Sequence, residues 1–143
     1  MASIRCLNSA EGAGWKALHG DCVDVVAQLP DASIGLSVYS PPFGNLFVYS
    51  ESAADMGNSA DDDEFSAHYR YLVRELFRVT MPGRLTAVHC SDLPMQKWRD
   101  GEIGIKDFSG QIIVCPLQFS GLGRQQITLV FQLQVIFDAL PAA

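Results

Sequence analysis

Strand-like and helix-like segments alternate along the chain between residues 15 and 92. The strand-like segments are 15–21, 32–40 and 84–92, and the helix-like segments between them are 22–29 and 61–79. Strands separated by helices usually join one parallel sheet, because parallel neighbours need a long crossover connection and a helix provides it. We therefore predict an α/β fold with a mostly parallel sheet flanked by helices.

The clearest single element is the segment DDDEFSAHYRYLVRELFRV, residues 61–79. Its acidic start favours a helix N-terminus, and a Pro82-Gly83 pair follows its end. Its apolar residues recur at helical spacing: Phe65, Tyr69, Leu72, Val73, Leu76 and Val79. The shorter helix over 22–29 has Asp21 at the position of an N-cap and ends at Pro30. Both helices are predicted from capping and spacing together.

The remaining segments have weaker patterns. In the strand 84–92, Leu85, Ala87 and His89 should share one face and Thr86, Val88 and Cys90 the other. Residues 1–14 receive no firm structure, 44–60 form a long loop and a candidate lid, and 93–113 are loop-like with a short element near 108–113. Strict apolar alternation over 127–137 suits a strand or a hairpin arm.

Length and charge limit the classes of function. A chain of 143 residues is the size of one domain and can bury a core without disulfides or a metal. Its formal net charge of −6 argues against holding nucleic acid by bulk electrostatics, because Lys and Arg supply most of such affinity. Any contact with nucleic acid should therefore be local.

Cysteine usage and hydropathy indicate a cytoplasmic chain. The four cysteines have no C-x-x-C spacing, so reduced thiols are expected, and no signal segment is recognisable. The most apolar stretch, 126–140, is interrupted by polar residues and is short for a membrane span, which needs roughly 20 apolar residues. We expect no membrane association.

The second strand is an apolar run typical of a buried strand, and it ends in an unusual motif, Ser40-Pro41-Pro42-Phe43. Ligands of open α/β sheets bind beyond the carboxyl ends of the strands. The prolines fix the backbone there, which holds the Ser40 side chain and the nearby carbonyl groups in one orientation beside the Phe43 ring. Acceptors beside an aromatic platform suit a flat ring that carries an exocyclic amino group. The alternative is a strand that simply ends in a rigid turn.

The motif and its flanks resemble the amino-group DNA methyltransferases, which modify adenine N6 or cytosine N4. The similarity covers roughly 15–113, through LHGDCVDVVAQLPDASIGLSVYSPPF and HYRYLVRELFRVTMPGRLTAVH, and best fits the permuted subgroup whose catalytic motif comes first. The resemblance implies a partial, Rossmann-like methyltransferase sheet, with DNA as substrate and S-adenosylmethionine as cofactor. It implies that Ser40 and the Pro41 carbonyl accept hydrogen bonds from the target amino group and that Phe43 stacks on a flipped-out base. It also implies that Asp21 lies near the adenine end of the cofactor.

The chain departs from that family beyond residue 113. The family's Phe-x-Gly-x-Gly loop is matched in letters by FSGLG, Phe119–Gly123, without the acidic residue before it or the small residues after it. We therefore divide the chain into an N-terminal extension (1–14), a catalytic-motif region (15–113) and a divergent segment (114–143). Three hypotheses remain: an incomplete methyltransferase, a non-catalytic remnant or interaction module that dimerises through 126–137, and a chain whose missing half comes from a complementing chain.

Several other residues have two readings. His19, Cys22, His89 and Cys90 could be proposed as metal ligands, but four convergent ligands are lacking and buried strand residues are expected instead, so no metal is predicted. Arg70, Arg74 and Arg78 repeat at i, i+4 and could contact phosphate or form a solvated helix face. Trp15 and Trp98 are expected to pack rather than to stack on a base.

Overall fold

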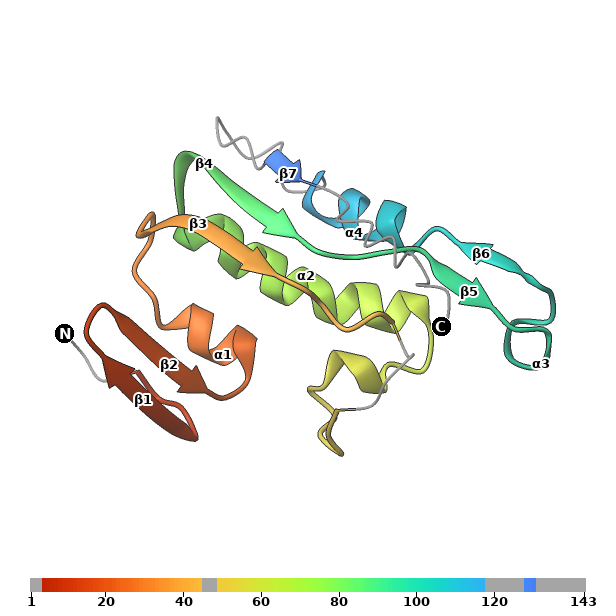
Figure 1. The fold of residues 1–143 in the computed structure, drawn as a ribbon, viewed down its shortest axis with the longest axis horizontal. Coiled ribbons are helices and arrows are strands. Elements are labelled where there is room, and N and C mark those ends of the chain that lie inside the picture. The colour runs from red at the N-terminus through yellow and green to blue at the C-terminus, as the bar shows by residue number, and fades with distance from the viewer. Residues whose placement is uncertain (1–3, 45–48, 118–127, 131–143) are drawn as a thin grey trace, which may run out of the picture.

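The computed structural model describes residues 4–44, 49–117 and 128–130 (Figure 1). The elements, in chain order, are β1 (Asn8–Gly12), β2 (Trp15–His19), α1 (Cys22–Ala27), β3 (Ile34–Tyr39), the 3₁₀ helix η1 (Met56–Asn58), α2 (Asp62–Val79), β4 (Thr80–Val88), β5 (Leu93–Met95), α3 (Lys97–Asp100), β6 (Gly104–Lys106), α4 (Phe108–Leu117) and β7 (Thr128–Val130).

The central sheet is parallel, as predicted, and has the strand order β3-β4-β7. Leu36 pairs with Leu85 and Tyr39 pairs with Val88 in the register of β3 and β4. The long helix α2 makes the crossover between these two strands and packs on one face of the sheet (Figure 1). The α/β fold expected from the alternation of segments is confirmed.

The strand predicted over 15–21 does not join this sheet. β2 instead pairs antiparallel with β1, from Gly12 opposite Trp15 to Asn8 opposite His19, and the two form a separate hairpin. The two strands are too close in sequence for a parallel crossover, so a tight turn with Gly14 at φ +81° joins them. No firm structure was expected over 1–14, and this is wrong for β1. Its sequence, NSAEG, has no alternating pattern of apolar residues from which a strand could be predicted.

The core lies between α2 and the sheet. All six apolar residues predicted for the inner face of α2 are buried. Met56 from η1, Val88 and Cys90 from the β4 side, Leu93 from β5, and Phe108 and Ile112 from α4 belong to the same buried core. The Tyr39 and Tyr69 hydroxyls lie 2.7 Å apart and join the end of β3 to the middle of α2. The helical spacing therefore identified the core correctly.

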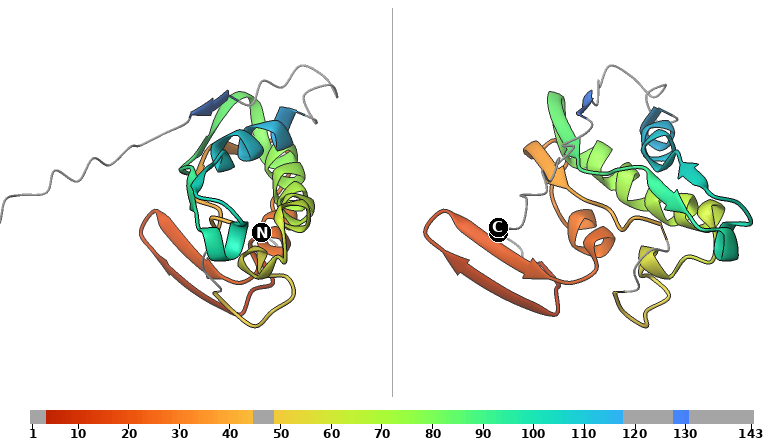
Figure 2. Two further views of the ribbon diagram at one scale, coloured as in Figure 1. Left: turned by 90° about the vertical axis from the view of Figure 1, so that its right-hand side faces the viewer. Right: turned by 45° about the vertical axis from the view of Figure 1, so that its right-hand side comes forward.

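The opposite face of the sheet is bare in the part of the chain that the structure describes. The side chains of Leu36 and Val38 are 59% and 71% exposed, and Leu85, beside Leu36, is 43% exposed. Helices α1, α2 and α4 all lie on the other side of β3 and β4 (Figure 2). The two-face prediction for β4 is confirmed, since Thr86, Val88 and Cys90 are buried, but the strand before the Ser-Pro-Pro-Phe motif is not a buried one.

Two further segments differ from the prediction. β4 begins at Thr80, directly after α2, so Pro82-Gly83 lies within the strand rather than in a turn before it. The first part of the loop-like segment 93–113 forms the β5–β6 hairpin with α3 at its tip, whereas the short element expected near 108–113 is confirmed as the start of α4. Three-residue strands are too short to produce a recognisable period. Of the alternating segment 127–137, residues 128–130 are described and form β7, and the others lie outside the described residues.

Both tryptophans are more exposed than expected. Trp98, in α3, is 82% exposed, so the packing role predicted for it is wrong. Trp15 is 57% exposed and lies against Gly12, where an added Cβ would meet the indole ring at 2.5 Å. None of the described helices is both long and apolar enough to cross a membrane.

Arg78 joins the end of α2 to the end of α1. Its guanidinium donates to the carbonyl oxygens of Val26, Ala27 and Leu29 at 3.2, 3.0 and 2.8 Å. It also donates to the carboxylates of Asp31 at 2.5 Å and Glu75 at 2.8 Å. These carbonyls belong to the last turn of α1 and to the residues just after it, where helical hydrogen bonding ends; that of Val26 also accepts from the Leu29 N–H at 3.0 Å. Arg78 is thus a structural residue and not a phosphate ligand.

Candidate functional site

The Ser-Pro-Pro-Phe motif lies at the carboxyl end of β3, where the sequence placed it. The backbone N–H of His89 donates to the Tyr39 carbonyl at 2.8 Å, which holds the end of β4 beside the end of β3. Ser40 and His89 therefore follow the neighbouring strands β3 and β4 at the same edge of the sheet. This is the edge of a parallel sheet at which ligands bind.

The Ser40 hydroxyl is oriented by the backbone of His89. It donates to the His89 carbonyl oxygen at 3.0 Å, and the ring nitrogen Nδ1 of His89 lies 3.5 Å from Oγ. Ser40 is exposed, so the lone pairs of its oxygen can be reached. Because the only hydroxyl proton is used in the bond to the carbonyl, Oγ meets a further ligand as a hydrogen-bond acceptor.

Phe43 is anchored in a tight turn. Pro41 is buried, and the backbone N–H of Gly44 donates to the Pro42 carbonyl at 3.0 Å, with Gly44 at φ +55°, where glycine is favoured. The half-buried Phe43 ring meets Phe108 edge-on, with centroids 6.0 Å apart and planes at 86°. It is tilted against the His89 ring at 6.2 Å. The core fixes one edge of the Phe43 ring and leaves part of it accessible.

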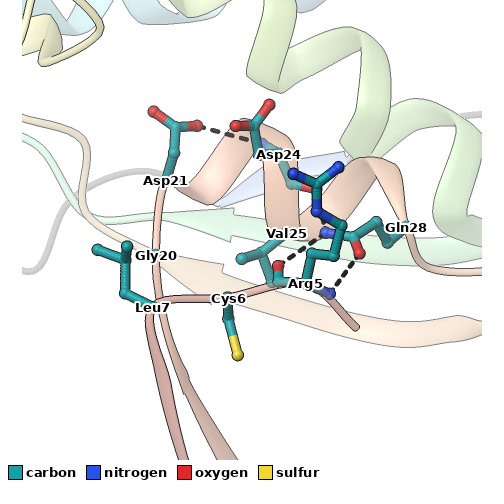
Figure 3. Close-up of a pocket in the computed structure, with 8 residues that line it drawn as sticks. All are labelled: Arg5, Cys6, Leu7, Gly20, Asp21, Asp24, Val25 and Gln28. Carbon is teal, nitrogen blue, oxygen red and sulfur yellow. Dashed lines mark hydrogen bonds between the residues drawn. The ribbon is translucent and has the colours of Figure 1, made fainter. Parts of the chain in front are cut away.

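Asp21 is the N-cap of α1, as predicted. Its Oδ1 accepts from the backbone N–H groups of Val23 at 2.8 Å and Asp24 at 3.1 Å. Both bonds use the same oxygen, so Oδ2 does not take part in the cap. Figure 3 shows the Asp21 carboxylate turned toward Asp24 at the rim of an open cavity of about 570 Å³. That volume lies within the range of about 300 to 1,000 Å³ typical of small-molecule sites.

A second cavity, of about 290 Å³, is also lined by Asp21. Its lining combines the start of α1 with the loop after the Ser-Pro-Pro-Phe motif and with α2: Asp21, Val23, Asp24, Ala54, Met56, His68 and Tyr71. The buried Nδ1 of His68 has no hydrogen-bond partner among the described residues. The fold therefore brings Asp21 close to the loop that continues from Phe43, although the two lie far apart in the sequence.

Several solved structures match the fold of this chain. Three of them are crystal structures of a proposed DNA modification methylase from Thermus thermophilus. The selenomethionine form is 24% identical with a TM-score of 0.53, and the match covers 69% of this chain and 35% of that one. The complex with S-adenosyl-L-methionine is 22% identical with a TM-score of 0.53, covering 71% and 39%. The third structure is 24% identical with a TM-score of 0.52, covering 69% and 37%.

The fold is that of a partial methyltransferase. The chain spans only 35–39% of the length of the matched structures. No protein-family model matches the sequence, and no curated protein does. The match therefore confirms the fold class predicted from the sequence and shows that most of the matched fold has no counterpart in this chain.

His89 is the site residue that sequence reasoning missed. It was expected to be a buried strand residue, but it is exposed at the end of β4 and contacts both Ser40 and Phe43. Its position at the carboxyl end of a strand next to β3 was the one sequence feature that could have identified it.

Cys90, the next residue, is buried as expected. Burial raises the pKa of its thiol, as does the charge of the nearby Asp92, while a hydrogen bond to Ser109 lowers this pKa in part.

Other predicted candidates do not join the site. No group of three or more His, Cys, Asp or Glu side chains within residues 4–44, 49–117 and 128–130 could hold a metal ion. Cys6, Cys22 and Cys90 are free thiols. Arg70 borders a cavity of about 390 Å³ shared with Asp62, Asp63 and Asp107, and these carboxylates disfavour phosphate there. The candidate donor loop, Phe119–Gly123, lies outside the described residues.

The loop that follows the motif is organised by Asp55. Oδ2 accepts from the N–H groups of Tyr49 and Ser50 and from the Ser50 hydroxyl, at 3.1, 2.7 and 3.1 Å, and Oδ1 accepts from the Gly57 N–H at 2.8 Å. Burial by itself would raise the pKa of the Asp55 carboxyl, but these hydrogen bonds outweigh it and the pKa is lowered. The charged form of Asp55 is therefore favoured in the folded loop.

We expect the order of this loop to depend on pH on the acid side. A lowered carboxyl pKa stabilises the folded loop above the ordinary pKa of 3.8, and that stabilisation is lost as the pH falls through the folded value. At neutral pH, Asp55→Asn should increase amide hydrogen exchange at Ser50 and Gly57 several-fold, since an amide has one acceptor oxygen. Glu51→Gln, in the same loop, is the control. Equal exchange in both variants would contradict this role of Asp55.

Proposed function

We propose that this chain is the target-base part of an S-adenosylmethionine-dependent DNA methyltransferase that methylates an exocyclic amino nitrogen, cytosine N4 or adenine N6. The observation that carries the proposal is the orientation of the Ser40 hydroxyl. Its proton is donated to the His89 carbonyl, so Oγ offers lone pairs, and the Phe43 ring lies against the ring of the same His89. An acceptor next to an aromatic ring suits an amino-substituted base.

In this proposal the motif aligns the target amino group. Ser40 Oγ and the carbonyl oxygen of Pro41 accept its two hydrogens, and the nitrogen lone pair then points away from both acceptors. Phe43 stacks on the base and is kept in place by Phe108. Alignment of this kind is the main contribution that a protein makes when the reacting group is already activated.

Asp21 and the two cavities beside it are the part of the chain that would hold the cofactor. S-adenosylmethionine supplies a methyl group activated by a sulfonium. The Asp21 Oδ2 atom lies outside the cap of α1 and is available to accept from a hydroxyl or amino group at the rim of the cavity of about 570 Å³. This carboxylate acceptor fits the adenosyl end of such a cofactor, which carries both hydroxyl and amino groups.

The substrate side of the proposal is a single base taken out of the duplex. With a net charge of −6, the chain has little capacity to hold DNA by phosphate neutralisation. A flipped base brings the amino group to the motif without a broad basic surface. The matched methylase is described as acting in DNA modification, which supports DNA as the substrate class.

The second candidate function is that of a non-catalytic interaction module in the cytoplasm. The exposed apolar side chains of Leu36, Val38 and Leu85 favour it, because such a face is typical of a protein interface. Cofactor binding distinguishes the two candidates, since an interaction module has no need to bind S-adenosylmethionine.

The decisive experiment is calorimetry of S-adenosylmethionine binding to the purified chain. We expect saturable binding that Asp21→Ser weakens at least about tenfold, which corresponds to 1.4 kcal/mol. Serine keeps the N-cap, so α1 should remain folded while the carboxylate is lost. Asp63→Ser is the matched control, because this exposed carboxylate lies in the first turn of α2 and lines neither of the two cavities. Absence of binding, or equal binding by Asp21→Ser, would exclude the cofactor role of Asp21.

A further inference from the structure

The imidazole of His89 contacts two residues of the Ser-Pro-Pro-Phe motif, and the proposed function gives it no role. Its Nδ1 lies 3.5 Å from Oγ of Ser40, and its ring lies against the Phe43 ring with centroids 6.2 Å apart. The side chain is exposed, so it can exchange protons with solvent. Histidine side chains change charge between about pH 5 and 8. The charge of His89 therefore changes beside the atoms that align the target amino group in the proposed function.

The backbone of His89 fixes the position of this ring relative to Ser40. Its N–H donates to the Tyr39 carbonyl at 2.8 Å, and its carbonyl accepts from the Ser40 hydroxyl at 3.0 Å. These two bonds join His89 to consecutive residues at the end of β3. The imidazole can therefore approach Oγ or withdraw from it by rotation of its own side chain, without any movement of the strands.

The distance between Nδ1 and Oγ indicates which ring nitrogen carries the proton in the neutral form. An N–H donor normally lies about 2.7 to 3.2 Å from an oxygen acceptor, and the observed 3.5 Å is longer than that. An unprotonated Nδ1 has no donor with which to approach Oγ more closely, because the hydroxyl proton is already used in the bond to the His89 carbonyl. The geometry therefore favours a neutral ring with its proton on Nε2, which leaves the lone pairs of Oγ to a ligand.

Protonation of His89 changes the hydrogen bonding and the charge of the site together. Both ring nitrogens of a protonated histidine are donors, so Nδ1–H would donate to Oγ and occupy a lone pair that the amino group needs. A bond of this kind is charge-assisted and stronger than a neutral one. The imidazolium would also lie beside a nitrogen that becomes positive as it forms its bond to the methyl group, and like charges at short range repel.

We propose that His89 is a positioning residue whose neutral imidazole keeps Ser40 as a hydrogen-bond acceptor, and that protonation of His89 closes the site to the amino group of the target base. The inference rests on the proposed function, because it concerns the same acceptor oxygen. Methyl transfer is then fastest above the pH range in which His89 titrates and is lost as the pH falls through that range.

The other titratable groups beside His89 have partners of their own. They lie at the end of β3, in the segment after β4 and at the start of α4: Tyr39, Cys90, Asp92 and Asp107. All four have hydrogen-bond partners; the Asp92 carboxylate, for example, accepts from the Ser109 N–H at 3.0 Å. Carboxyl groups ordinarily titrate near about pH 4, and thiols and phenols above about pH 8. A transition between these limits therefore points to a histidine.

The first test is nitrogen-15 NMR of the histidine rings in the chain without cofactor. The chain has three histidines, so comparison with His89→Gln assigns the His89 ring. We expect the neutral ring to carry its proton on Nε2. In the protonated ring, the Nδ1 proton should exchange with water at least about tenfold more slowly than in Ser40→Ala, because Oγ accepts it. A neutral ring with its proton on Nδ1, or an Nδ1 proton that Ser40→Ala leaves unchanged, would overturn the proposal.

The second test is the pH dependence of single-turnover methyl transfer from S-adenosylmethionine to duplex DNA. We expect the wild-type rate to fall at least about tenfold from about pH 8 to pH 5, and the rate of His89→Gln, whose side chain stays neutral, to change less than about twofold. His19→Gln, which replaces another exposed histidine at the end of β2, should keep the wild-type profile. Far-UV circular dichroism at both pH values verifies that the variants are folded.

The two tests separate failure of this inference from failure of the proposed function. A fall in rate that persists in His89→Gln would overturn the role of His89 and leave the methyltransferase function intact. Absence of transfer by the wild type at every pH would sink the proposed function. The NMR result is read without cofactor or DNA, so it decides in either case whether protonation of His89 engages the Ser40 hydroxyl.

Discussion

Arg78→Ala is expected to lower the free energy of unfolding by about 3 kcal/mol. The guanidinium donates five hydrogen bonds, three of them to carbonyl groups at the end of α1 and two to the carboxylates of Asp31 and Glu75. Bonds that involve a charged group contribute more than neutral ones, and the partners left behind include partly buried carbonyls. A loss of this size is a large fraction of the total stability of about 5 to 15 kcal/mol of a small domain.

Urea unfolding curves of three variants test this expectation. Arg74→Ala removes an exposed arginine one turn earlier in α2 and should change the free energy of unfolding by about 0.5 kcal/mol or less. Arg78→Lys keeps the charge without the planar set of donors and should fall between the two. If Arg78→Ala were no more destabilising than Arg74→Ala, the link between α1 and α2 would not depend on this side chain.

The elements predicted correctly are those with long or well-capped patterns. α2 has eighteen residues, so its apolar spacing is repeated often enough to be unambiguous, and all of its predicted core residues are buried. Asp21 caps α1 as predicted, because capping depends on neighbouring residues alone. The strand β2 was predicted, but its pairing with β1 and the β5–β6 hairpin were not, since β1 has no large apolar residue and β5 and β6 have three residues each.

Only the part of the candidate site that depends on neighbouring residues in the sequence was predicted. The rigid Ser40–Phe43 motif is local, and its position at the end of β3 follows from the strand before it. The contact between Ser40 and His89 joins residues 49 apart and depends on the register of β3 and β4, which no local pattern reveals. The exposure of Leu36 and Val38 was missed because an apolar strand is ordinarily a covered one, and here the described residues include no cover.

Ser40→Ala is expected to reduce methyl transfer to the target amino group about a hundredfold while S-adenosylmethionine binding stays unchanged. The hydroxyl is held by the His89 carbonyl at 3.0 Å and offers a fixed acceptor, so its loss misaligns the amino nitrogen rather than removing a cofactor contact. A misplacement of about 1 Å costs rates of this order. The measurement is single-turnover transfer of labelled methyl from S-adenosylmethionine to duplex DNA by the purified chain.

The variants Ser40→Asn and Ser33→Ala separate alignment from simple damage. Asparagine restores an acceptor oxygen at the same position and should recover much of the rate. Ser33 donates its hydroxyl to the Pro30 carbonyl at 2.7 Å, before β3, so Ser33→Ala removes a hydroxyl from the same region without touching the motif. An equal fall in cofactor binding and rate in Ser40→Ala would contradict the alignment role. A rate lost in Ser40→Ala and restored in Ser40→Asn, by contrast, would identify the acceptor oxygen as the group on which transfer depends, because asparagine shares little else with serine at this position.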